Sequence, residues 1–123
     1  MEFIAYKMDG LGNDFIIIDR RESSINLTKE KIIELGDRSN IGFDQIIFID
    51  KKKESSFPIK IFNSDGGEVS ACGNGSRCVA YLLGKNLNTK EIKLKTNNRV
   101  LNAKIVGNLK VELEKFLKNS WAH

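Results

Sequence analysis

The sequence predicts an α+β domain in which a mostly antiparallel sheet wraps around a central helix. Short apolar runs typical of strands dominate the chain, and only two segments have the spacing of an amphipathic helix. Strands and helices do not alternate in the regular order of a parallel α/β sheet. The chain has 123 residues, enough for one domain with a hydrophobic core and too few for two domains of ordinary size.

The first two expected strands lie near the N-terminus. Residues 3–7 form one of them, and residues 8–14 contain two glycines, which favour a turn. Residues 15–19 are a continuous apolar run, which is typical of a strand buried on both faces. We therefore expect a strand, a turn and a central strand.

A short helix should follow a polar loop. Thr28 is a residue type favoured at helix N-caps, and the helix is expected over residues 29–37, unless Gly36 ends it earlier. Its apolar residues are Ile32, Ile33 and Leu35.

Two more strands lead to a glycine-rich loop. Residues 41–43 read as a turn into an apolar strand over residues 44–50, and the lysine-rich residues 51–56 as an exposed connection. Residues 57–63 form the next strand, with Pro58 near its start, where a missing N–H is tolerated.

The glycine-rich loop leads into the central helix. Gly66, Gly67, Gly73 and Gly75 let the backbone turn sharply and approach a ligand closely. From Gly75 onward the apolar residues fall at helical spacing, and Gly84 or Asn86 would end the helix. The buried face is predicted to consist of Gly75, Cys78, Val79, Leu82 and Leu83.

The C-terminal part alternates apolar and polar residues. Residues 91–114 read as a three-stranded antiparallel meander with turns at Asn97-Asn98 and Gly107-Asn108. Leu101, Ala103 and Ile105 share one face of it. Residues 114–123 have no clear partner, and we expect a short helix or a frayed end there.

Composition excludes several classes of function. The net charge of +4 comes from basic residues scattered along the chain, with no nucleic-acid-binding motif, and no apolar run is long enough to cross a membrane. The start of the chain lacks the features of a signal peptide, so we expect a cytoplasmic protein. One histidine, His123, and no CxxC pair make a metal site improbable, and two thiols fit a reducing compartment.

Cys72 is the candidate reactive residue because it stands at or just before the central helix. Unpaired N–H groups and the helix dipole favour an anion there, either the thiolate or a ligand carboxylate. No histidine is placed to serve as the base of a cysteine protease, and no GK[ST] follows the glycines as in a phosphate-binding loop. The chemistry that remains for Cys72 is proton transfer by its thiolate. Cys78, on the apolar helix face, is instead expected in the core.

The chain resembles the N-terminal half of the diaminopimelate epimerase family. The resemblance covers residues 3–113 and rests on four ordered motifs, which are Lys7-Met8-Asp9-Gly10-Leu11-Gly12-Asn13-Asp14-Phe15, Gly42-Phe43-Asp44-Gln45, Phe62-Asn63-Ser64-Asp65-Gly66 and Cys72-Gly73-Asn74-Gly75-Ser76-Arg77-Cys78. It implies one half of a two-domain fold with the active site in the cleft between the halves. It also implies an isomerase that interconverts LL- and meso-diaminopimelate without a cofactor, on the route to lysine and peptidoglycan.

The resemblance also assigns roles to residues. It implies that Cys72 is one of a pair of proton-transferring cysteines. It implies that the substrate is bound by Asn13, Gln45, Asn63, Gly73 and Asn74. Asp9 stands where the family usually has histidine. The family's C-terminal half, which carries the second cysteine, is absent from this sequence.

These observations predict an epimerase N-terminal-type domain over residues 1–113 and a terminal extension over residues 114–123. The expected partners are a small amino-acid substrate and either a second copy of the chain or a separate C-terminal half, with no nucleic acid and no membrane. Three alternatives stay open: a truncated, non-catalytic remnant, a carboxylate-binding domain, and a related proline-racemase-like or phenazine-isomerase-like protein.

Overall fold

The computed structural model describes residues 3–10, 12–69, 73–97, 99–105 and 111–118. In these ranges the chain forms eight strands and two helices. The elements are β1 (Phe3–Gly10), β2 (Asn13–Asp19), α1 (Lys29–Gly36), β3 (Gln45–Ile49), β4 (Phe57–Asn63), β5 (Glu68–Val69), α2 (Gly73–Leu87), β6 (Glu91–Thr96), β7 (Arg99–Lys104) and β8 (Val111–Lys118).

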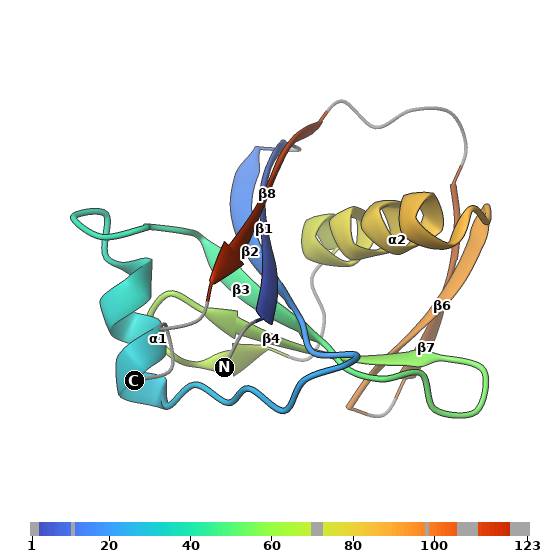
Figure 1. Cartoon of the computed structure of the whole chain (residues 1–123), viewed down its shortest axis with the longest axis horizontal. Helices are drawn as coiled ribbons and strands as arrows, with labels where there is room; N and C mark the ends of the chain where they lie inside the picture. The colour runs from blue at the N-terminus through green and yellow to red at the C-terminus, as the bar shows by residue number, and fades with distance from the viewer. Residues whose placement is uncertain (1–2, 11, 70–72, 98, 106–110, 119–123) are drawn as a thin grey trace.

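The strands form one mixed, mostly antiparallel sheet in the order β7-β6-β4-β3-β2-β1-β8, with β5 paired to β4. Only the pairs β2–β3 and β4–β6 are parallel. The sheet curves around α2, with β1, β2 and β8 on one side of the helix and β6 and β7 on the other (Figure 1). The predicted fold class, an α+β sheet wrapped around a central helix, is confirmed.

The hydrophobic core has two parts because the central strands are buried on both faces. In β2, Phe15 and Ile17 pack with α2, whereas Ile16 and Ile18 pack on the opposite face with α1. All four side chains are fully buried. The prediction of a strand buried on both faces is therefore confirmed, and β3 repeats the pattern.

The turn between β1 and β2 is shorter than the sequence predicts. The register pairs Gly10 with Asn13, so the strands continue through most of the glycine-containing segment. Gly12 adopts a φ of +84°, a left-handed conformation that glycine tolerates best. Met8, expected in the turn, is a buried core residue of β1.

Helix α1 begins and ends close to its predicted limits. The Thr28 side chain accepts a hydrogen bond from the Lys31 N–H at 3.1 Å, which confirms the N-cap. The helix ends at Gly36, the alternative end, and Asp37 caps it. Of its apolar residues, Ile32 and Leu35 are buried, whereas Ile33 is 43% exposed.

The predicted buried face of α2 is confirmed, and the helix starts directly after Cys72 as predicted, but of the two predicted ends Gly84 is wrong and Asn86 is one residue short. Cys78, Val79, Leu82 and Leu83 are buried in the core. The helix begins at Gly73 and continues through Gly84 to Leu87. Gly84 does not end the helix, because it serves close packing: a Cβ there would meet Ile105 Cδ1 and lie 2.9 Å from the Thr89 carbonyl oxygen.

The C-terminal meander is only half confirmed. β6 and β7 pair in antiparallel fashion, and Leu101, Ala103 and Ile105 pack against the core as predicted. The third strand, β8, instead pairs with β1 at the other end of the sheet, in a register that sets Tyr6 opposite Lys115. Alternating apolar residues predict a strand but not the strand with which it pairs. Without β8, the outer edge of β1 would be unpaired.

The strand β8 also corrects the expectation for the C-terminal segment. It runs to Lys118, past residue 113, so residues 114–118 are strand rather than short helix or frayed end. The predicted turn at Gly107-Asn108 and residues 119–123 lie outside the described residues.

Candidate functional site

The fold brings three predicted substrate-binding residues to the same edge of the sheet. Asn13 begins β2, Gln45 begins β3 and Asn63 ends β4. β2 and β3 are parallel, and β3 and β4 are antiparallel with Gln45 directly opposite Asn63. The starts of β2 and β3 and the end of β4 therefore lie at the same end of the sheet, which brings together three residues that are distant in sequence.

Gln45 and Asn63 form a direct amide pair. The Gln45 Nε2 donates to Asn63 Oδ1 at 2.9 Å, and the pair is partly buried. Within the part of the chain that the structure describes, the buried Gln45 Oε1 has no hydrogen-bond partner. A buried acceptor without a donor costs free energy, and a ligand donor would offset that cost.

The turn after Asn63 redirects the chain toward α2. The Asn63 N–H donates to the Gly67 carbonyl and the Gly66 N–H to the Asn63 carbonyl, both at 2.9 Å. Gly66 adopts a φ of +85°, and a Cβ there would lie 2.6 Å from Lys29 Cγ, so glycine is required. β5 then pairs with the last part of β4 before the chain continues to α2.

The start of α2 supplies backbone donors for an anion. Gly73 and Asn74 form its first turn, where the N–H groups have no carbonyl partner within the helix. The first turn contains no acidic residue, so no carboxylate of its own offsets the positive end of the helix dipole. Cys72 and the side chain of Asn74 lie outside what the structure describes.

The second cysteine has the place predicted for it. Cys78 is fully buried on the face of α2 that packs against the sheet. It is therefore a core residue.

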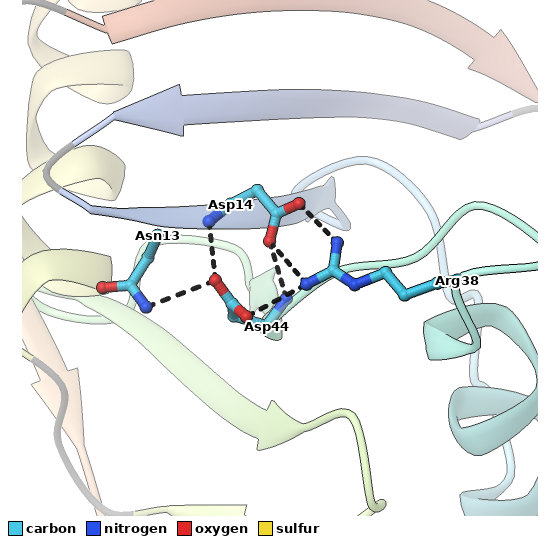
Figure 2. A network of polar contacts seen from close by, with 4 residues as sticks. All are labelled: Asn13, Asp14, Arg38 and Asp44. Atoms are coloured by element: carbon cyan, nitrogen blue, oxygen red, sulfur yellow. Dashed lines mark hydrogen bonds and ion pairs between the residues drawn. The ribbon is translucent and has the colours of Figure 1, made fainter.

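Asn13 belongs to a polar network that the sequence did not predict (Figure 2). Its Nδ2 donates to Asp44 Oδ2 at 3.3 Å, and the Asp14 N–H donates to the same oxygen at 3.0 Å. The Asp44 N–H in turn donates to Asp14 Oδ1 at 3.0 Å. Arg38 binds both carboxylates, at 2.6 Å to Asp14 Oδ2 and 3.0 Å to Asp44 Oδ1.

This network changes the acidity of Asp14. Hydrogen bonds from the Arg38 guanidinium, supported by contacts from Asp44, hold the pKa of the Asp14 carboxyl below its ordinary value, although partial burial acts in the opposite direction. Asp14 and Asp44 each stand beside a predicted substrate-binding residue in sequence. Their adjacency in sequence could have indicated that Asp14 and Asp44 lie near the site. Their contacts with Arg38 follow only from the folded structure.

The described residues contain neither a metal-binding cluster nor a helix that could cross a membrane. No three His, Cys, Asp or Glu side chains of this part of the chain are grouped so that they could hold a metal ion. No helix of the described ranges is long and apolar enough to cross a membrane.

Comparisons with known proteins agree with the motifs. The profile of the diaminopimelate epimerase family matches residues 5–116. Diaminopimelate epimerase of Pelagibacter ubique (strain HTCC1062) is 54% identical over 114 residues, which are 93% of this chain and 42% of that protein. Diaminopimelate epimerase of Coxiella burnetii (strain RSA 493) is 40% identical over 113 residues, 88% of this chain and 41% of that protein.

Solved structures show the same fold at low sequence identity. A phenazine biosynthesis protein of the PhzF family from Enterococcus faecalis superposes with a TM-score of 0.65 at 15% identity, over 85% of this chain and 40% of that one. A protein described as a predicted epimerase from Pseudomonas aeruginosa gives a TM-score of 0.63 at 17% identity, over 90% and 42%. This chain spans about two-fifths of the length of the curated relatives it matches, and it belongs to the diaminopimelate epimerase family as a match to the N-terminal half.

Proposed function

We propose that this domain forms one half of the active site of an amino-acid epimerase that interconverts LL- and meso-diaminopimelate without a cofactor. The observation that carries the proposal is the sheet edge where Gln45 and Asn63 form their amide pair, followed in sequence by the donor-bearing start of α2. Amides and backbone N–H groups are suited to an amino acid, which carries both ammonium and carboxylate groups. The motifs and the relatives' names supply the substrate.

Cys72 would act as the base or acid on one face of the substrate. Its thiolate removes the α-proton, the C–H bond breaks, and the electron pair moves toward the substrate carboxylate. The N–H groups of Gly73 and Asn74 would stabilise the charge that develops there. A thiol on the opposite face then returns a proton to the α-carbon, which inverts its configuration.

That second thiol would come from a second half of the active site. It would be provided either by a C-terminal half or by a second copy of this chain. The reaction would serve the synthesis of lysine and of peptidoglycan precursors in the cytoplasm.

A titration of the isotopically labelled chain with diaminopimelate, followed by NMR, tests the site. We expect the largest shifts at the side-chain amides of Gln45 and Asn63 and at the backbone amides of Gly73 and Asn74. Lysine, which lacks the second carboxylate of diaminopimelate, is the control ligand and should bind more weakly.

A different pattern of shifts would contradict the proposed site. A surface hollow of about 610 Å³ is lined by Lys52, Lys93, Lys104 and other residues, none of them a candidate. Shifts centred on that hollow, or no shifts at saturating ligand, would overturn the assignment. Binding at the expected residues without proton exchange, in the presence of a complementary half, would instead support the carboxylate-binding alternative.

A further inference from the structure

Asn13 can present its side chain to a ligand in two ways, because an amide has a donor end and an acceptor end of nearly the same shape. The structure determines which end of the amide faces Asp44. Asp44 Oδ2 is 3.3 Å from Asn13 Nδ2, and an ionised carboxylate can only accept hydrogen bonds. The amide nitrogen must therefore point to Asp44, and Oδ1 points to the opposite side (Figure 2).

Asp44 can orient Asn13 only if its own carboxylate is fixed. Three donors fix it: the Asn13 amide and the Asp14 N–H at Oδ2, and the Arg38 Nη2 at Oδ1. The Asp44 backbone is fixed as well, since its N–H donates to Asp14 and its carbonyl accepts from the Ser64 N–H at 3.2 Å. The carboxylate thus has little freedom to rotate.

Arg38 is what allows two carboxylates to lie side by side. Asp14 and Asp44 would repel each other, and the guanidinium fork places one positive charge between them through two nitrogens. Arg38 is held over Gly42, which has a φ of +71° and where a Cβ would lie 2.8 Å from Arg38 Cδ. The glycine leaves space for the arginine side chain.

We propose that Arg38, Asp14 and Asp44 are positioning residues that fix the amide of Asn13 with its nitrogen on Asp44, so that its oxygen, on the side away from Asp44, serves as a hydrogen-bond acceptor for the substrate. The inference rests on the proposed function for the identity of the substrate. The orientation of Asn13 itself can be measured without any ligand.

The test is the side-chain amide signal of Asn13 in the full chain, compared between wild type and Asp44→Asn. An asparagine has only one oxygen, so at position 44 it cannot accept from both Arg38 and Asn13. We expect the Asn13 side-chain resonances to move and the affinity for diaminopimelate to fall by about threefold to tenfold, the loss of one such hydrogen bond.

Asp50→Asn is the matched control. Asp50 follows the other end of β3 and forms a two-nitrogen pair with Arg20, at 2.7 and 2.9 Å. This variant also removes a carboxylate from an arginine pair, but it lies away from Asn13. It should leave both the Asn13 signal and the affinity unchanged, which separates positioning from a general loss of stability.

Arg38→Lys provides a second variant in case Asp44→Asn does not fold. Lysine keeps the charge but not the fork, so it can satisfy only one carboxylate at a time. We expect a smaller shift of the Asn13 signal in the same direction.

An Asn13 signal that is unchanged in Asp44→Asn or, failing that, in Arg38→Lys would overturn the inference, as would an unchanged affinity. A wild-type chain that does not bind diaminopimelate would refute the proposed function but not the positioning of Asn13. In that case the Asn13 signal still decides whether the network positions the amide.

Discussion

The two cysteines differ in a way that can be measured directly. Cys78 is fully buried in the core, whereas Cys72 precedes the first residue of α2, where a helix N-terminus lowers the pKa of a thiol. We therefore expect iodoacetamide to alkylate Cys72 much faster than Cys78 near neutral pH. Mass-spectrometric mapping after a brief reaction measures both rates. Equal labelling, or labelling mainly of Cys78, would contradict the assignment of Cys72.

Arg38 should also affect stability in acid. The folded-state pKa of Asp14 lies below its ordinary value of 3.8, mainly because of Arg38. A lowered carboxyl pKa contributes stability that is present above the unfolded-state value and lost as the pH falls through the folded-state value. Arg38 is 60% exposed, so the contribution is about 1 kcal/mol or less.

Arg38→Leu should consequently be less stable than wild type at pH 6, and the difference should shrink as the pH falls below the ordinary aspartate pKa and disappear once Asp14 is protonated in both proteins. Urea denaturation at several pH values measures this difference. A difference that is independent of pH would show that the arginine stabilises the fold by packing rather than through the Asp14 carboxylate.

At the scale of single elements, Gly84 shows how closely α2 packs on the β6–β7 hairpin. Replacing a glycine inside a helix with alanine normally stabilises the helix by about 1 kcal/mol. At position 84 the new Cβ would meet Ile105 Cδ1 and the Thr89 carbonyl oxygen. We expect Gly84→Ala to lower the free energy of unfolding by about 1–3 kcal/mol.

The control for this substitution is the same change in an Ile105→Ala background. Removing the isoleucine makes room, so Gly84→Ala should cost less there than in wild type. Urea denaturation of the four proteins gives the coupling. If Gly84→Ala stabilised the wild-type chain, or cost as much in the Ile105→Ala background as in wild type, the close packing against Ile105 would be disproved.

Elements whose signals are local were predictable from the sequence. Thr28 marks the start of α1, and the spacing from Cys78 to Leu83 identifies the buried face of α2. The start of α2 after Cys72 was predictable, but its end was not, because Gly84 reads as a helix end until its contact with Ile105 is known. The role of a glycine in a helix thus depends on a neighbour more than twenty positions away.

At the scale of the whole molecule, pairings between distant segments were the hardest to predict. Alternation in the C-terminal part indicates strands, but nothing in it shows that β8 joins β1 rather than β7. The contacts that join Asn13 and Asp14 to Arg38 and Asp44 were not predictable either, because these residues lie 24 to 31 positions apart. The motifs pointed to Asn13, Gln45 and Asn63, and the fold explains why these residues share one edge.

The end of the sheet that carries Asn13, Gln45 and Asn63 should be covered by a second half-site. A domain that forms one half of an active site presents ligand-binding groups that a second half would normally face. We expect the purified chain to form a two-fold dimer through the surface around Cys72. Light scattering with cross-linking at that surface measures this. A monomer, or a dimer joined through the outer sheet edges β7 or β8, would rule out self-completion and leave a separate C-terminal half as the partner.

The central claim, that this domain supplies a proton-transferring half-site for diaminopimelate, is tested most directly by a chimera. Joining this chain to the remaining C-terminal part of the Pelagibacter ubique relative, to which it is 54% identical, restores a full-length protein. In heavy water the chimera should convert LL-diaminopimelate to the meso form with deuterium entering at the α-carbon. Cys72→Ser should abolish rapid exchange, and Cys78→Ser in a chimera that remains folded should not. A folded chimera without exchange, or exchange that persists without Cys72, would contradict the account.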